Sequence, residues 1–313
     1  MLEHAELPEA PWLDEVFATR LARPTIPGTI KQQLEDFCVF EALALEPIGE
    51  GEHVYLQVTK KGANTAWVAE QIAAFAGVRA LDVGYAGRKD RHAIARQWFS
   101  VYLPGTDCNW SDLEIEGVCL EQVCRHTRKL RPGEISENRF EIVVRHRMLA
   151  AAEKRDLETR LQAIQLNGFP NFFGRQRFGR DLHNIENADR LLRFGERVRG
   201  DKGMILSAAR AWLFNRFLSR QIETGGGAIV GPLYGKSRDP QAGEEELGAV
   251  YEAWVEGLRR RGAKVGERAL FVVPHELVWN QADDSTRLSF GLPAGSFATS
   301  LLAEIFVVED AAS

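Results

Sequence analysis

The chain has 313 residues, a length typical of about two domains. Hydrophobic residues make up 45% of it and charged residues of both signs 27%, so the composition excludes a disordered chain and allows a sizeable core. The formal net charge of -5 argues weakly against a nucleic-acid partner, although such binding depends on local clusters of cations. No run of about 18 apolar residues occurs, so no membrane span is expected.

Predicted strands dominate the first half of the chain. Apolar patterns flanked by turn residues predict strands at 36–45, 53–59, 81–84, 97–103, 113–123 and 139–146. A helix is predicted at 65–76, with Asn64 or Thr65 as its N-cap and Gly77 at its end, and a second one at 149–166. This order predicts an antiparallel sheet with interposed helices, an α+β arrangement.

The pattern changes at Gly168. Residues 168–180 are rich in glycine, arginine and phenylalanine, and we expect them to form a loop. Mostly helical segments follow near 184–195, 204–223 and 244–261, strands return at 270–273 and 286–292, and a helix closes the chain around 297–306. We therefore expect one sheet domain interrupted by a helical insertion rather than two domains in tandem.

The sequence lacks the usual signals of cofactors, metals and export. Its four cysteines form no CxxC pair and no metal-ligand spacing, which favours buried, reduced thiols in a cytoplasmic protein. The N-terminal stretch MLEHAELPEA is acidic and does not resemble a signal peptide. No Gly-x-Gly-x-x-Gly follows a strand. We expect any chemistry to need neither cofactor nor metal.

Three clusters of cations stand out, at 125–131 (RHTRKLR), 174–180 (GRQRFGR) and 259–264 (RRRGAK). A single cluster of this kind is usually a solvated face. The second is interleaved with phenylalanines, and arginine with an aromatic ring can bind phosphate and stack on bases. Together the clusters predict a cationic surface for a partner the size of a tRNA.

One acid lies among cations in the stretch GYAGRKDRHA, residues 84–93. Asp90 is flanked by Arg88, Lys89 and Arg91, and most aspartates in such a setting are N-caps or surface ion pairs. Adjacent cations also favour the charged form of a carboxylate. An ionised carboxylate can act as a covalent nucleophile or as a base. Gly84 and Gly87 would let a substrate approach the backbone closely.

AGRKDRHA resembles the signature of the tRNA pseudouridine synthase D (TruD) family, whose aspartate stands at the position of Asp90. Further segments match the family in the same order, from Lys31 to Leu302. They are TIKQQLEDFCVFE (29–41), GEGEH (49–53), GxNT (62–65), RHTRKLRPG (125–133), ENRFEIVVR (137–145), PNFFGRQRFG (170–179), LSAARAWLFN (206–215) and LPAGSFATSLL (292–302).

The resemblance implies a pseudouridine synthase fold with a mixed, mainly antiparallel central sheet and a mostly helical insertion domain. The catalytic domain would comprise residues 1–166 and 269–313, and the insertion domain residues 167–268. The family usually has a longer segment where this chain has TGGGAIV, so the insertion domain is expected to be shortened near 224–230.

The implied activity is the isomerisation of uridine 13 in tRNA to pseudouridine, without a cofactor. Asp90 would attack either C1′ of the ribose or C6 of the base. Lys31 would keep Asp90 ionised, Phe140 would stack on the target base, and Asn138 would hold the loop or the substrate. Residues implied to contact RNA are Arg88, Lys89, Arg91, Arg128, Lys129, Gln176 and Arg177.

Alternatives follow from the same residues. Phe140 begins the predicted strand RFEIVVR, and apart from the family it would be assigned to the core. The protein could also be a non-catalytic RNA-binding or RNA-folding protein, or a synthase that acts on another RNA. We expect a cytoplasmic monomer with tRNA as its substrate and no membrane or protein partner.

Overall fold

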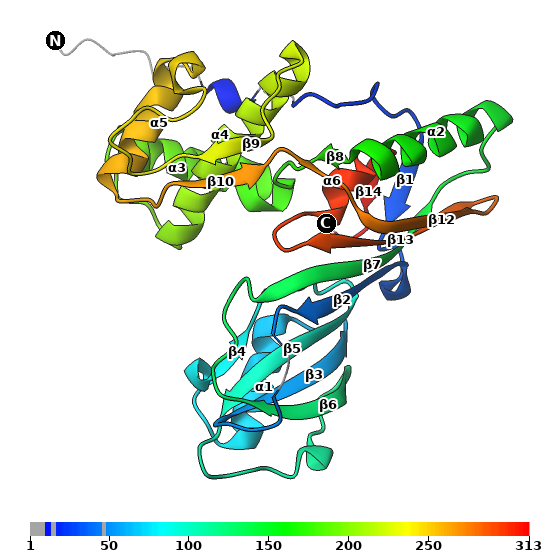
Figure 1. Ribbon diagram of the computed structural model, residues 1–313, viewed down its shortest axis with the longest axis vertical. Helices are drawn as coiled ribbons and strands as arrows, with labels where there is room; N and C mark the ends of the chain where they lie inside the picture. The colour runs from blue at the N-terminus through cyan, green and yellow to red at the C-terminus, as the bar shows by residue number, and fades with distance from the viewer. Residues whose placement is uncertain (1–9, 14–16, 46–47, 313) are drawn as a thin grey trace. The chain divides into compact units, whose positions relative to one another are not determined.

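The computed structural model describes residues 10–13, 17–45 and 48–312, which form two compact units (Figure 1). The sheet unit comprises Pro24–Gly168 and the described residues from Val273 onward. The helical unit comprises Phe169–Val272 together with the described residues before Pro24. The predicted sheet domain began at residue 1. The described residues before Pro24 belong instead to the helical unit, where the buried Trp12 ring lies 5.6 Å from that of Trp254. Residues 1–9 of that predicted domain lie outside the described residues.

The sheet unit is built on a mixed sheet, which confirms the predicted α+β class. Its main path runs β12-β13-β7-β2-β5-β3-β6, with β1, β14 and β4 joined at the sides. Neighbours are antiparallel except for the pairs β2–β5 and β1–β14. The bounds are β1 Pro27–Ile30, β2 Phe37–Leu43, β3 His53–Lys61, β4 Val83–Tyr85, β5 Ile94–Tyr102, β6 Val118–His126, β7 Ile135–Arg145, β12 His275–Gln281, β13 Ser285–Pro293 and β14 Val307–Asp310.

Helices α1 (Thr65–Ala76), α2 (Ala151–Asn167) and α6 (Ala298–Leu302) belong to this unit. The side chain of Asn64 accepts a hydrogen bond from the backbone of Ala66 at the start of α1, and Gly77 ends the helix with φ 66°. Both signals were predicted. Val68 and Ile72 of α1 pack in one buried cluster with apolar residues of β3 and β5, so α1 covers this part of the sheet.

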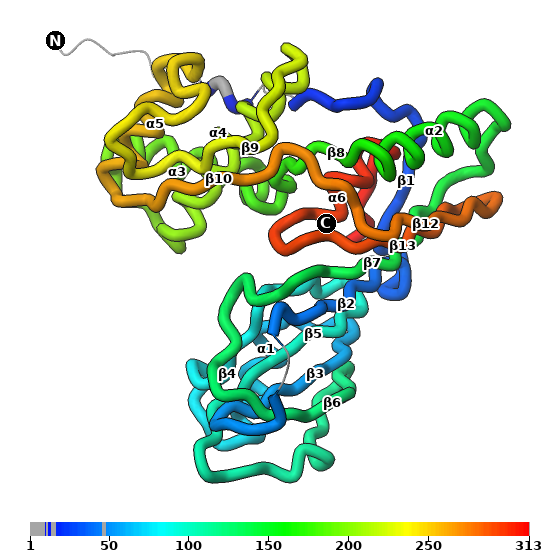
Figure 2. The backbone as a smooth tube through the Cα atoms, viewed as in Figure 1, coloured from blue at the N-terminus to red at the C-terminus, as the bar shows by residue number. Residues whose placement is uncertain are grey.

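Other predictions need correction. Strand β6 begins at Val118 rather than at residue 113, because a 3₁₀ turn at Trp110–Asp112 and Gly117, with φ 71°, precede it. Helix α6 is shorter than the predicted segment 297–306. Strands β1, β12 and β14 were not predicted, and Figure 2 shows β1, in blue, beside the red C-terminal strand β14.

The helical unit contains α3 (His183–Arg193), α4 (Lys202–Thr224) and α5 (Ala249–Arg260). Two short ribbons accompany them, β8 (Phe169–Pro170) with β11 (Phe271–Val272) and β9 (Val230–Leu233) with β10 (Gly266–Ala269). Leu191, Trp212 and Trp254 form part of their common core. Within the described ranges, the helices are too short or too polar to span a bilayer.

The expected burial of the cysteines is wrong, whereas Arg260, Arg261 and Lys264 of the cluster RRRGAK are exposed, as a cationic surface requires. The cationic cluster RRRGAK has partners inside the chain, since Arg259 pairs with Glu244 at 2.6 Å and the next two arginines donate to carbonyl oxygens at the end of α3. None of the four cysteines is buried, and Cys119 is exposed on β6. The contacts of Arg260 and Arg261 with α3 show that the RRRGAK cluster supports the junction of α3 and α5.

Candidate active site

Asp90 and Lys31, which are far apart in sequence, meet in the sheet unit. Asp90 lies in the loop between β4 and β5, and 47% of its side chain is exposed. Lys31 Nζ donates a hydrogen bond of 2.6 Å to Asp90 Oδ2 and another of 2.7 Å to Asp310 Oδ2. The predicted lysine–aspartate pair therefore forms, and a second carboxylate that the sequence did not indicate joins it.

The Lys31 ammonium is held in its charged form inside the protein. Only 7% of its side chain is exposed, and its backbone has φ 57°, a left-handed conformation that is unusual for lysine. Burial opposes the charge, but the hydrogen bonds to Asp310 and Asp90 outweigh it and raise the pKa of Lys31 above its usual value. The site therefore presents a partly exposed carboxylate on a fixed cation.

Contacts of the Lys89 side chain and backbone hold the Asp90 loop in place. Its ammonium lies 2.7 Å from Glu41 Oε2 and donates to Asn138 Oδ1 at 2.7 Å, while its backbone N–H donates to Thr65 Oγ1 at 3.0 Å. The exposed fractions of the Lys89 and Glu41 side chains are 8% and 0%. Lys89 thus points inward rather than toward a phosphate as we expected, and Asn138 contacts the loop that it was predicted to hold.

A second lysine beneath the loop was missed. Lys60 is fully buried on β3, and its ammonium donates to the carbonyl of Asp90 at 2.6 Å and to that of Ala63 at 2.8 Å. Burial lowers the pKa of Lys60 to about 8, although the Asp90 carboxylate partly opposes this. The alternation of β3 could have revealed it, because Lys60 follows Val54, Leu56 and Val58 on the apolar face.

Phe140 forms part of the floor next to these residues. Its ring lies 6.0 Å from that of Phe37 and 5.5 Å from that of Phe290, measured between centroids. Phe37 in turn lies under Lys31, whose Nζ is 5.1 Å from the ring centroid. Only 7% of Phe140 is exposed, so it has core contacts here, and its stacking on a base stays a prediction.

The two glycines before Asp90 have different surroundings. A Cβ on Gly84 would lie 2.4 Å from the carbonyl oxygen of Leu130, closer than packed atoms allow. A Cβ on Gly87 would meet no atom nearer than Lys89 Nζ, at 4.0 Å. Gly84 is therefore required by the packing of β4, whereas the space beside Gly87 is open.

The other predicted RNA contacts are distributed over both units. In the sheet unit, Arg88 and Arg91 are exposed beside Asp90, and Arg128 is exposed but paired with Glu134. Lys129 donates to the carbonyl of Leu81.

Two of these residues lie in the helical unit. Gln176 is exposed there. Arg177 is half-buried, donates to Ser207 Oγ at 3.2 Å, and has a pKa lowered by burial. Among the predicted RNA contacts of the sheet unit, Arg88 and Arg91 are the exposed cations in the loop that carries Asp90.

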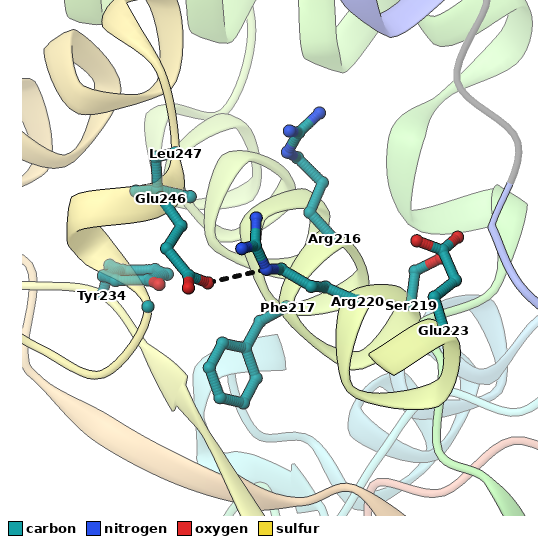
Figure 3. Close-up of a pocket in the computed structure, with 9 residues that line it drawn as sticks. Arg216, Phe217, Ser219, Arg220, Glu223, Tyr234, Glu246 and Leu247 are labelled. Carbon is teal, nitrogen blue, oxygen red and sulfur yellow. Dashed lines mark hydrogen bonds and ion pairs between the residues drawn. The ribbon is translucent and has the colours of Figure 1, made fainter. Parts of the chain in front are cut away.

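A pocket in the helical unit contains none of the predicted site residues (Figure 3). Arg220 Nε lies 2.8 Å from Glu246 Oε2 across it, so charges of both signs line it. The lining residues are Arg216, Phe217, Ser219, Arg220, Glu223, Tyr234, Gly243, Glu246 and Leu247. Among the described residues, no three histidine, cysteine, aspartate or glutamate side chains are grouped as a metal site.

Comparison with known proteins gives consistent similarities. A family model described as tRNA pseudouridine synthase D (TruD) matches residues 15–189. The chain is 43% identical to a tRNA pseudouridine synthase D from Cellvibrio japonicus, over 87% of each chain. It is 38% identical to one from Nitrosococcus oceani, over 92% of this chain and 93% of that one. A crystal structure from Methanosarcina mazei named for the same family matches with a TM-score of 0.68 and 18% identity, over 93% of this chain and 96% of that one.

Proposed function

Because the chain belongs to the tRNA pseudouridine synthase D (TruD) family, whose members are isomerases, we propose that it converts uridine 13 of tRNA to pseudouridine with Asp90 as the nucleophile. The observation that carries this proposal is the pairing of Asp90 with Lys31. The ammonium orients one carboxylate oxygen, while nearly half of the Asp90 side chain stays exposed for a substrate. A carboxylate nucleophile has to be ionised and within reach of its substrate.

The reaction balances without any further reagent. In one route the carboxylate displaces uracil from C1′, the electron pair of the C1′–N1 bond leaves with the base, and an ester forms. In the other it adds to C6, the carbonyl at C4 takes up the electron pair, and the C1′–N1 bond then breaks with its electron pair staying on the base. In either route the base turns, C5 bonds to C1′, Asp90 leaves as carboxylate, C5 loses a proton and N1 gains one. Substrate and product are isomers, so we expect no cofactor.

The surrounding residues would position the Asp90 carboxylate for the reaction. Lys60 and Lys89 fix the backbone of the Asp90 loop, and Asn138 orients Lys89. Extrusion of a stacked base costs on the order of a few kcal/mol. Stacking on Phe140 would offset part of this cost. Arg88 and Arg91 would meet the phosphates that flank the uridine.

Other features of the proposal concern the whole chain. We propose that residues 167–268 are the family's insertion domain, shortened at 224–230, where only five residues separate α4 from β9. We also propose that the enzyme acts as a cytoplasmic monomer without a protein partner. Sedimentation of the protein alone and with tRNA tests the monomer, and cell fractionation tests the compartment.

The test compares wild type with Asp90→Asn on a tRNA transcript that contains uridine 13, by carbodiimide labelling and primer extension. We expect pseudouridine only with wild type, and tRNA binding by both proteins. Asp82→Asn removes another carboxylate, from a surface pair with Arg79, and serves as the matched control with full activity. Turnover by Asp90→Asn at the wild-type rate would rule out the nucleophile, and labelling at another uridine would rule out position 13.

A further inference from the structure

Lys31 is held by two carboxylates, and the second comes from the C-terminal strand. Asp310 Oδ2 is 2.7 Å from Lys31 Nζ, nearly as close as Asp90 Oδ2. The parallel pairing of β14 with β1 places Asp310 opposite Ile30, the residue before Lys31. Asp310 Oδ1 also accepts a hydrogen bond of 3.0 Å from the backbone of Ala312. The sheet therefore fixes this carboxylate against the ammonium.

The two carboxylates differ in what the proposed reaction does to them. Asp90 is 47% exposed and gives up its charge when it forms a covalent bond with the substrate, whereas the exposed fraction of Asp310 is 28%. Lys31 is almost buried, and a buried cation that loses its partner is costly. Once Asp90 is bonded to the substrate, Asp310 would be the carboxylate left on Lys31.

We propose that Asp310 is a positioning residue that keeps Lys31 charged and in place while Asp90 is bonded to the substrate. This inference rests on the function proposed above. The charged groups that act on Lys31 are Asp90, from the β4–β5 loop, and Asp310, from β14, and the Phe37 ring of β2 covers another side. Asp310 also contributes to the raised pKa of Lys31, so its removal lowers that pKa.

The first experiment measures single-turnover pseudouridine formation by Asp310→Asn across pH, with tRNA affinity measured separately. Because the pair is partly exposed, we expect the rate to fall about three- to tenfold. We also expect its decline at alkaline pH to begin at a lower pH, with tRNA affinity unchanged. Asp310→Glu should restore most of the rate. Glu309→Gln, which removes the neighbouring exposed acid of the same strand, should behave as wild type.

The second experiment follows Lys31 without turnover, by the pH titration of its ¹³Cε signal. In Asp90→Asn, which imitates the spent nucleophile, we expect Lys31 to keep a raised pKa, and in Asp90→Asn/Asp310→Asn to lose it. An unchanged titration in the double variant overturns the inference, as does an Asp310→Asn rate equal to that of wild type. If wild type itself forms no pseudouridine, the proposed function fails, and the titration still decides whether Asp310 holds Lys31.

Discussion

Removal of the Glu41 charge should destabilise the support beneath Asp90. The Glu41 carboxylate is fully buried, lies 2.7 Å from the Lys89 ammonium and accepts the N–H of Trp98 at 3.1 Å. Glu41→Gln keeps an acceptor for Trp98 but leaves Lys89 without a counter-charge. Breaking a buried pair costs about 3–5 kcal/mol, and because Lys89 retains Asn138 we expect about 3 kcal/mol. Turnover should fall as well, because Lys89 precedes Asp90.

A double-mutant cycle in urea measures this cost, with the hydrogen exchange of the Trp98 amide as a local probe. Lys89→Met should also destabilise, whereas Glu41→Gln/Lys89→Met, which removes both charges, should recover about 3 kcal/mol relative to the sum of the single variants. Glu35→Gln breaks the exposed pair with Lys61 and should leave stability unchanged. Additive losses, or a Glu41→Gln variant as stable as wild type, would refute the reasoning.

Three further predictions concern Gly84, Lys60 and Arg88, which lie in or next to the Asp90 loop. Gly84→Ala should lower the melting temperature and Gly87→Ala should not, because only a Cβ at Gly84 would meet a carbonyl oxygen, that of Leu130 at 2.4 Å. Equal melting temperatures of the two variants would contradict this. The pKa of Lys60 is about 8 when folded and 10.5 when unfolded, so the unfolded chain binds more protons between these values. The stability of wild type relative to Lys60→Met should therefore rise from pH 8 to pH 10.5 in urea titrations, and a constant difference would count against a buried, charged Lys60. Arg88→Ala should weaken tRNA binding and reduce the slope of log affinity against log salt by about one, whereas Arg261→Ala, whose guanidinium caps α3, should change neither.

Local signals predicted much of the sheet unit. Helix α1 begins and ends where Asn64 and Gly77 indicate, because capping depends on neighbouring residues alone. The pairing of β1 with β14 joins segments about as far apart as the chain allows, and short strands of four residues carry little periodicity. Asp310 could not be found for this reason, since its role depends on that register.

The direction in which a charged side chain points is a second feature that the sequence did not predict. Arg88, Lys89 and Arg91 look alike as neighbours of Asp90, yet Lys89 alone turns inward to Glu41. The buried carboxylate of Glu41, which attracts Lys89, lies on β2, so spacing within the loop does not distinguish the three cations. Lys60 is different, because its place on the apolar face of β3 follows from alternation within one strand.

The most direct test of the central claim is a map of pseudouridine in all RNA from a deletion strain, complemented with wild type or with Asp90→Asn at equal protein levels. We predict that wild type restores pseudouridine at position 13 of tRNA and that Asp90→Asn restores none. Modification restored by Asp90→Asn would contradict the assignment of Asp90 as the nucleophile. Restoration by wild type only at sites in other RNAs would contradict tRNA uridine 13 as the substrate.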